Sequence, residues 1–291
     1  MNSIKEVIKN RRSVRTFDGK GLSPAHLEML EQYVSNLSNP FGVNVEFRFF
    51  DAARAEQKLT SPVLVGERLY FAVKSKKEAN FEAACGYEFE KACIYAASLG
   101  IGTVILAGTF NREEFEKAME VQADEVMPVV SPIGYPASKM SLRETMMRKG
   151  VKADERMAFE EVFFDGFYGI KLTKEKADRY ADAFEMVRLA PSAVNKQPWR
   201  LIKDGNNIHF YEKQTTKENA LGDIQKIDLG IAMAHFELAA AEDGIQGQFV
   251  IAEPELDVPE GVYYIATYKA ENCSDLQDTG GILDEQVSAF V

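Results

Sequence analysis

The sequence has few of the residues that build metal sites and disulfide frameworks. Only three histidines and three cysteines occur among 291 residues, and none of them shows the spacing of a metal-ligand set. Cys85 and Cys93 lie on one predicted helix about two turns apart, which indicates buried packing thiols in a reducing compartment. We therefore expect no metal ion and a cytoplasmic location.

Long apolar runs are also missing. No stretch approaches the roughly 20 residues that a membrane-spanning helix needs, and Lys5 and Glu6 come too early for a signal peptide. The formal net charge of -11 argues against a nucleic-acid partner. With 46% hydrophobic and 27% charged residues, the composition is that of a soluble globular enzyme or binding protein, for which we expect neither a membrane nor a nucleic acid as partner.

Two familiar catalytic patterns are absent as well. The pairs Gly19/Gly21 and Gly100/Gly102 do not continue to the third glycine of a dinucleotide-binding fingerprint. The chain offers no clear Ser-His-Asp triad or carboxylate pair, so we nominate no catalytic side chain.

What the sequence does contain is an arginine cluster, Arg11-Arg12-Ser13-Val14-Arg15, at the predicted end of the first helix. Guanidinium groups match phosphate oxygens two at a time, so the cluster is suited to bind an anion. A solvated basic helix end is the alternative interpretation. Residues 1–150 carry 20 Lys+Arg against 19 Asp+Glu, while the rest carry 34 − 20 = 14 against 45 − 19 = 26, which favours an anion site in the first half.

The predicted elements describe a mixed α+β chain. Ser3 with Glu6, and Ser23 before Pro24, predict two helix starts, and a long buried helix is predicted over 81–99. The other predicted elements are strands over 45–49, 68–73, 103–106 and 126–133, a helix capped by Asn111 and a basic linker through Arg148 and Lys149. We divide the chain into a first half, 1–150, a second half, 151–270, and an acidic tail, 271–291.

Residues 159–270 repeat the plan of the first half. The pattern Phe17-x-Gly19-x-x-Leu22-Ser23 recurs as Phe167-x-Gly169-x-x-Leu172-Thr173, at an offset of 150 residues, and the helix after it recurs over 177–189. At an offset of 144, Gly86, Ala97, Gly100 and Ile101 recur as Gly230, Ala241, Gly244 and Ile245. Two such matches in the same order indicate an internal duplication, and so a fused pseudo-dimer.

The two halves differ at two places, and at each place only one half carries the motif. At an offset of 150, the arginine cluster corresponds to Glu161-Val162-Phe163-Phe164-Asp165. Conversely, the loop over 190–199 has only a shorter counterpart over 37–42. Each half holds a part that the other lacks, so we expect one complete site at the junction of the halves.

These motifs resemble the FMN-dependent nitroreductase superfamily, in particular its branch of single-chain tandem nitroreductases. Four segments carry the resemblance, which covers roughly residues 1–270. They are Arg-Arg-Ser-x-Arg-x-Phe at 11–17, Gly-Ile-Gly-Thr at 100–103, Gly-Tyr-Pro at 134–136 with Lys139, and Ala-Pro-Ser-x-x-Asn-x-Gln-Pro-Trp at 190–199.

The resemblance implies a nitroreductase-like α+β fold in which two tandem halves form an intramolecular pseudo-dimer. It also implies an FMN site whose phosphate and ribityl chain lie at the arginine cluster, with the 191–195 loop reaching the flavin from the second half. Ala193 stands where many members have serine, and backbone contacts from the loop should survive. The implied cofactor-binding residues are Arg11, Arg12, Ser13, Arg15, Leu106, Gly108, Thr109, Lys139, Arg143, Pro191, Ser192, Ala193 and Asn195.

The implied activity is an FMN-dependent oxidoreductase. NADH or NADPH would reduce the flavin, which would pass the electrons to a small electron-poor acceptor such as a nitroaromatic or a quinone. A non-catalytic FMN-binding protein or flavin carrier is the alternative, and a nucleotide-phosphate binder without flavin is a third possibility. The fused pseudo-dimer could act as a monomer.

Three further residues have simpler interpretations. Trp199, the only tryptophan, is expected in the core rather than in a binding site. Gln197 is expected to tie down its loop, and His235 to be a hydrogen-bonded core residue rather than a base.

Overall fold

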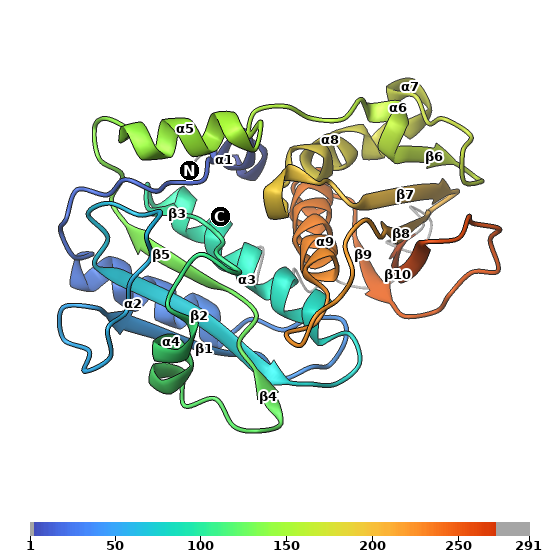
Figure 1. Cartoon of the computed structure of the whole chain (residues 1–291). Coiled ribbons are helices and arrows are strands. Elements are labelled where there is room, and N and C mark those ends of the chain that lie inside the picture. Colours follow the sequence, from blue (N-terminus) through green and yellow to red (C-terminus); the bar gives the residue numbers. More distant parts are fainter. Residues whose placement is uncertain (1–2, 272–291) are drawn as a thin grey trace.

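The computed structural model describes residues 3–271 (Figure 1). Most of the acidic tail, including Cys273, lies outside the described residues. The first half contains, in order, α1 (Ile4–Asn10), α2 (Pro24–Ser35), β1 (Glu46–Asp51), β2 (Leu69–Lys76), α3 (Phe81–Ser98), β3 (Gly102–Thr103), α4 (Arg112–Met119), β4 (Glu125–Val126), β5 (Val130–Gly134) and α5 (Leu142–Gly150).

The first sheet is antiparallel, with the strand order β1-β2-β5-β3, and β4 also pairs with β2. Residues of β2 alternate between two apolar layers, as the period of a strand requires. Tyr70 packs against Phe115 of α4 with ring centroids 5.0 Å apart, and Phe71 packs against Phe89 of α3 at 4.6 Å. The sheet is therefore covered by α3 on one face and by α4 on the other.

The second half repeats this topology. Its elements are α6 (Phe159–Val162), β6 (Phe163–Asp165), α7 (Lys174–Ala177), η1 (Asp178–Tyr180), α8 (Ala181–Leu189), η2 (Ala193–Asn195), β7 (Trp199–Asp204), β8 (Asn207–Lys213), α9 (Ile224–Glu242), β9 (Gly247–Val250) and β10 (Val262–Ala270). The order β7-β8-β10-β9 corresponds to β1-β2-β5-β3, again antiparallel, with β6 added in parallel beside β7. The duplication predicted from the sequence is therefore visible in the strand order.

The two halves meet along α3 and α9, which lie side by side in the middle of the molecule (Figure 1). A Cβ on Gly86 would come within 2.1 Å of the carbonyl oxygen of Ile227, and one on Gly230 within 2.0 Å of that of Ala83. Because 86 + 144 = 230 and 83 + 144 = 227, these are two copies of one contact. That reciprocity is the signature of a two-fold-related interface, here within one chain.

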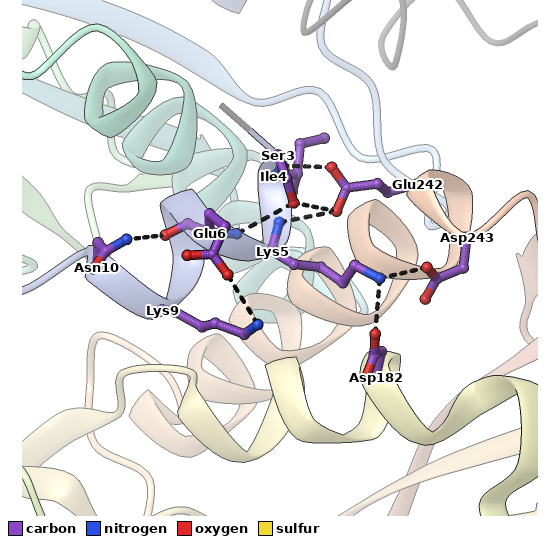
Figure 2. Close-up of polar contacts among 9 residues, drawn as sticks. All are labelled: Ser3, Ile4, Lys5, Glu6, Lys9, Asn10, Asp182, Glu242 and Asp243. Carbon is purple, nitrogen blue, oxygen red and sulfur yellow. Dashed lines mark hydrogen bonds and ion pairs between the residues drawn. The ribbon is translucent and has the colours of Figure 1, made fainter. Parts of the chain in front are cut away.

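Helix α1 belongs to the first half but is docked on helices of the second (Figure 2). The carboxylate of Glu242, at the end of α9, accepts bonds from the backbone N–H of Ile4 at 2.6 Å and of Lys5 at 3.1 Å, and from the Ser3 hydroxyl at 2.9 Å. The Lys5 ammonium pairs with Asp182, at 2.8 Å, and with Asp243. A carboxylate from one half thus satisfies the free N–H groups at the start of a helix of the other.

Five local predictions need correction, three of them on the end of α1 and on strands. The arginine cluster does not close α1, because Arg11 already has an extended backbone and Ser13 bridges to Thr103. The strand predicted over 103–106 is shorter, since β3 ends at Thr103. The strand predicted over 126–133 is divided into β4 and β5 around Pro128, which has no N–H for a ladder.

Two helical segments also differ from the prediction. The helix predicted over 177–189 is broken at Asp178, where φ is +54°, so that α7, η1 and α8 replace it. The expected basic linker through Arg148 is the helix α5, capped by the Ser141 hydroxyl, which accepts from the N–H of Glu144 at 3.1 Å. Ser141 and Glu144 form the Ser-x-x-Glu pattern that could have predicted this start.

The interpretations of the buried residues are confirmed. Trp199 and Cys85 are fully buried, Cys93 is nearly so, and both of these cysteines are free thiols. His235 is buried and hydrogen-bonded through both ring nitrogens. Across residues 3–271, none of the helices combines the length and the apolar character required to cross a bilayer.

Candidate functional site

A cavity of about 300 Å³ opens between the two halves. The first half supplies the segment after α1, the residues after β3 and the C-terminal part of α5, and the second half supplies the loop after α8 and the start of α9. The lining residues are Arg11, Arg12, Ser13, Arg15, 104–109, Met147, Arg148, Val151, Ala153, Asp154, Arg156, 191–195, Ile224, Ile227 and Asp228.

Most of the residues that the sequence nominated lie on this wall. The cavity brings together the arginine cluster, the segment from Leu106 to Thr109 and the loop from Pro191 to Asn195, which are distant in the sequence. They meet because α1 contacts α8 and α9, and because Asn195 of the loop after α8 bonds to Lys152 and Glu155 in the segment after α5. The complementary parts of the two halves therefore form one continuous wall.

Lys139 and Arg143 are exceptions. Lys139 is exposed, and the Arg143 guanidinium donates to the carbonyl oxygen of Pro62, so neither lines the cavity. Because the segment is the helix α5 rather than a linker, its C-terminal part supplies Met147 and Arg148 to the wall instead. Sequence reasoning missed Arg148, Arg156 and Asp228 as wall residues.

Glu144 organises the arginine cluster. Its side chain is fully buried and pairs with the guanidinium of Arg12 at 2.6 Å. Its other oxygen accepts from the backbone N–H of Arg15 at 3.2 Å and from the Thr16 hydroxyl at 2.7 Å. One carboxylate from α5 therefore fixes the extended segment that carries the arginines.

Glu90 on α3 likewise positions an arginine of the cluster, Arg11. Its buried carboxylate lies 3.5 Å from Nε of Arg11 and 2.8 Å from Nε2 of His235, which belongs to the second half. The carbonyl oxygen of Met186 can only accept, so Nδ1 of His235 carries the proton that forms the 2.9 Å bond to it. Arg11 is thus held by a carboxylate that also bonds across the junction.

Arg15 and Arg156 differ from the other arginines of the wall. Within residues 3–271, neither guanidinium forms an ion pair, and Nε of each is buried without a hydrogen-bond partner. Burial lowers the pKa of both groups, and the positive charge of Arg148 lowers both further. The nearby carboxylates of Glu144, for Arg15, and of Asp154, for Arg156, oppose this lowering of the pKa without forming an ion pair with either guanidinium.

The loop after α8 is held in an unusual backbone conformation. Val194 has φ of +44° and Asn195 of +58°, a region that β-branched residues rarely adopt. The Asn195 amide donates to the carbonyl oxygens of Lys152 at 2.8 Å and Glu155 at 3.0 Å. Gln197 ties the loop down as expected, because its side-chain oxygen accepts from the N–H of Met157 at 2.8 Å.

Asp228 changes one expectation for this loop. Its carboxylate oxygens accept from the backbone N–H of Ala193 at 3.0 and 3.1 Å, so that donor is already engaged. Asp228 is almost fully buried, and burial raises the pKa of its carboxyl well above the ordinary value. A backbone contact from Ala193 to a ligand would have to compete with this carboxylate.

Residues 3–240 match the sequence model of a protein family described as "Putative TM nitroreductase". The chain belongs to this nitroreductase family. Among curated proteins, none matches the chain.

Solved structures agree with the family assignment. A crystal structure described as a putative nitroreductase from Thermotoga maritima has a TM-score of 0.60 and 19% identity, and the match covers 92% of this chain and 93% of that one. This similarity shows that the chain has the nitroreductase α+β fold over nearly its whole length, as the sequence predicted.

Two nitroreductases match only half of this chain. An FMN-dependent nitroreductase from Clostridium difficile has 14% identity and a TM-score of 0.38, covering 49% of this chain and 94% of its own. A nitroreductase with bound FMN from Bacteroides fragilis has 18% identity and a TM-score of 0.40, covering 49% and 92%.

The wall of this nitroreductase-family cavity has a second, apolar part. Val104, Ile105, Leu106 and Ile227 line it, and a Cβ added to Gly108 would meet no atom within 4 Å. The cavity therefore combines several guanidiniums, two of them without an ion-pair partner among the described residues, with an apolar wall that leaves open space. Such a wall fits a ligand with one anionic group and one flat, largely apolar ring, and FMN is such a ligand.

Proposed function

We propose that the protein is an FMN-dependent oxidoreductase of the nitroreductase type, with the flavin in the junction cavity. One observation carries the proposal: the cavity wall joins the arginine cluster of one half to the Pro-Ser-x-x-Asn loop of the other. Membership of the nitroreductase family supports the same activity. NADH or NADPH is the proposed electron donor, and a small electron-poor molecule such as a nitroaromatic or a quinone is the proposed acceptor.

In this proposal the residues of the chain bind and orient, and the cofactor supplies the redox chemistry. Bound FMN supplies the group that takes up and releases the electrons. The arginine cluster binds the phosphate, with Arg11 and Arg12 held in place by Glu90 and Glu144. The apolar wall from Val104 to Gly108 excludes water from the ring. No catalytic side chain is needed for this division of roles.

The test is an anaerobic visible spectrum of the full chain reconstituted with FMN, before and after addition of NADH and then NADPH. We expect a flavin spectrum that bleaches with at least one of the two. A bound flavin inert to both donors would favour the flavin carrier over the enzyme. Colourless protein that takes up no flavin would overturn the proposal.

The asymmetry of the halves supports one FMN per chain. The segment that corresponds to the arginine cluster contains Glu161, the buried Phe163 and Phe164, and no arginine. Flavin released by heat denaturation and measured against chain concentration should give a ratio near one. A ratio of two would contradict the single site. We propose that the fused pseudo-dimer, which holds a whole site, can act as a monomer.

A further inference from the structure

Asp228 joins the loop over 190–199 to the helix α9 at the junction of the halves. It lies near the start of α9, lines the cavity and is only 2% exposed. Both of its carboxyl oxygens accept from the backbone N–H of Ala193, at 3.0 and 3.1 Å. Within residues 3–271, it is the one side chain outside the loop that bonds to Pro191, Ser192 or Ala193. The first part of the loop therefore depends on Asp228 for its place.

The later part of the loop is anchored by a different element. Asn195 and Gln197 bond to backbone groups of the segment over 152–157. Val194, which lies between these anchors and that of Asp228, has φ of +44°. Such a strained backbone persists only where the surrounding contacts hold it. Release of the loop at either anchor would therefore let Val194 relax.

The internal repeat supplies an independent observation. Because 84 + 144 = 228, Asp228 corresponds to Ala84 of α3. Ala84 is fully buried in an apolar cluster with Val43 and Phe81. The first half thus lacks both the Pro-Ser-x-x-Asn loop and the carboxyl group that would hold it. The acid and the loop occur together, in one half only.

A carboxyl group at this position costs free energy. Burial raises the pKa of Asp228, the bond from Ala193 opposes the rise, and the negative charges of Asp223 and Glu212 add to it. An apolar side chain of similar size would avoid this cost of desolvation and repulsion. The bond to the N–H of Ala193 is what an apolar side chain could not provide.

We propose that Asp228 is a positioning residue that fixes the backbone from Pro191 to Ala193 against the cavity. This inference rests on the proposed function, in which the loop contacts the flavin. Without Asp228, the N–H of Ala193 has no described partner, and the first part of the loop can leave the cavity wall. The apparent affinity for a ligand then falls with the fraction of chains whose loop is in place.

Hydrogen–deuterium exchange of the full chain without ligand tests the anchor directly. Asp228→Leu has a similar size but no acceptor, so deuterium uptake over 190–197 should become about tenfold faster, as expected for one lost hydrogen bond. Asp228→Asn keeps an acceptor oxygen and should stay within about threefold of the wild type. Uptake over 230–238, in the middle of α9, should not change in either variant, which distinguishes release of the loop from unfolding.

Asp223→Asn is the matched control. It removes a neighbouring buried acid that lies outside the cavity, and asparagine can still cap α9. Uptake over 190–197 should match that of the wild type. Three results would overturn the anchor: wild-type uptake in Asp228→Leu, equally fast uptake in Asp228→Asn and Asp228→Leu, or equally fast uptake in Asp223→Asn.

Titration with FMN, followed by quenching of flavin fluorescence, tests the positioning role. FMN affinity should fall about tenfold in Asp228→Leu and be restored to within about threefold in Asp228→Asn. Faster loop exchange with unchanged FMN affinity in Asp228→Leu would overturn this role. If neither the wild type nor any variant takes up flavin, only the proposed function is overturned, and the exchange rates still decide whether Asp228 anchors the loop.

Discussion

Gly102 and Gly108 lie near the cavity, and each is glycine for a different physical reason. A Cβ on Gly102 would come within 2.8 Å of the side chain of Val14, so the protein itself occupies that space. A Cβ on Gly108 would meet nothing within 4 Å, and the backbone there does not require glycine. Gly102 therefore serves packing beneath the arginine cluster, whereas Gly108 leaves room in the cavity.

Substitution of Gly108 by valine should weaken FMN binding and leave the stability of the protein nearly unchanged. Gly108 lies on the cavity wall and its added Cβ meets no protein atom within 4 Å, so we expect FMN affinity to fall at least tenfold while the free energy of unfolding stays within about 0.5 kcal/mol. Flavin titration and urea denaturation measure the two quantities. Gly102→Ala is the matched comparison, and overpacking against Val14 should destabilise it by about 1–3 kcal/mol. Full flavin binding by Gly108→Val would contradict this placement of the ring.

Glu212 on β8 is a buried carboxyl with an unusual titration. Its side chain is fully buried and, within residues 3–271, neither oxygen has a hydrogen-bond partner. The pKa of Glu212 is raised to about 7, chiefly by burial and also by the negative charges of Asp223 and Glu82, while Lys226 opposes the rise. Between the ordinary glutamate pKa and about 7, the folded protein keeps a proton that the unfolded chain has lost. Stability from this group is therefore lost as pH rises through that window.

Glu212→Gln removes the charge and should flatten this pH dependence. From pH 5 to pH 8 the wild type should lose about 2 kcal/mol relative to the variant. Urea denaturation at several pH values measures the difference. Glu113→Gln changes a glutamate that is 79% exposed and should follow the wild type. Parallel curves for Glu212→Gln and the wild type would show that Glu212 ionises normally.

At the scale of elements, α1 connects the junction to the cavity. Its first residues are bonded to Glu242 of α9, and the arginine cluster begins directly after its last residue, Asn10 (Figure 2). The helix has only seven residues, too few for independent stability, so its place depends on these tertiary contacts.

Loss of the Glu242 carboxylate should therefore affect both the stability of the protein and the arginine cluster that follows α1. Glu242→Ala removes the partner of two backbone N–H groups at the start of α1, and we expect destabilisation of about 1–2 kcal/mol. FMN affinity should also fall, because the segment that carries Arg11 to Arg15 is no longer fixed. Glu6→Ala is the control, since Glu6 pairs only with the nearby Lys9 and is exposed. Unchanged stability and affinity in Glu242→Ala would show that α1 is held by its apolar face alone.

At the scale of the whole molecule, the contact between α3 and α9 joins the two halves. Gly86 and Gly230 allow the backbones to approach: Gly86 lies against Ile227 and Gly230 against Ala83, and these two contacted residues are themselves related by the repeat. The cavity lies beside this crossing, because Ile227 is both a contact of Gly86 and a residue of the cavity wall. The geometry of the site thus depends on how closely the halves meet.

Gly230→Ala should force the two helices apart. Its Cβ would lie 2.0 Å from the carbonyl oxygen of Ala83, a backbone atom that cannot move alone. We expect a loss of about 3 kcal/mol in the free energy of unfolding, measured by urea denaturation, and weaker FMN binding. Gly150→Ala, where a Cβ meets nothing within 4 Å, is the matched control. Normal stability of Gly230→Ala would refute the close approach.

The sequence by itself determined the family, the duplication and most of the site wall. Motifs such as Arg11 to Arg15 and Pro191 to Asn195 are local, so their chemistry can be recognised without coordinates. The repeat predicted one shared site, because each half visibly lacked what the other had. Local signals were weaker for α5, where the capping pattern at Ser141 was overlooked and the site was assigned to Lys139 and Arg143.

Only the tertiary structure decided which arginines of the cavity wall form ion pairs. Arg12 is paired with Glu144, which lies 132 residues away, and no local pattern predicts that partner. Arg15 and Arg156 are distinguished by the absence of such a partner among the described residues. Whether a guanidinium is neutralised depends on charges brought near it by folding, and that is a property of the assembled junction rather than of any motif.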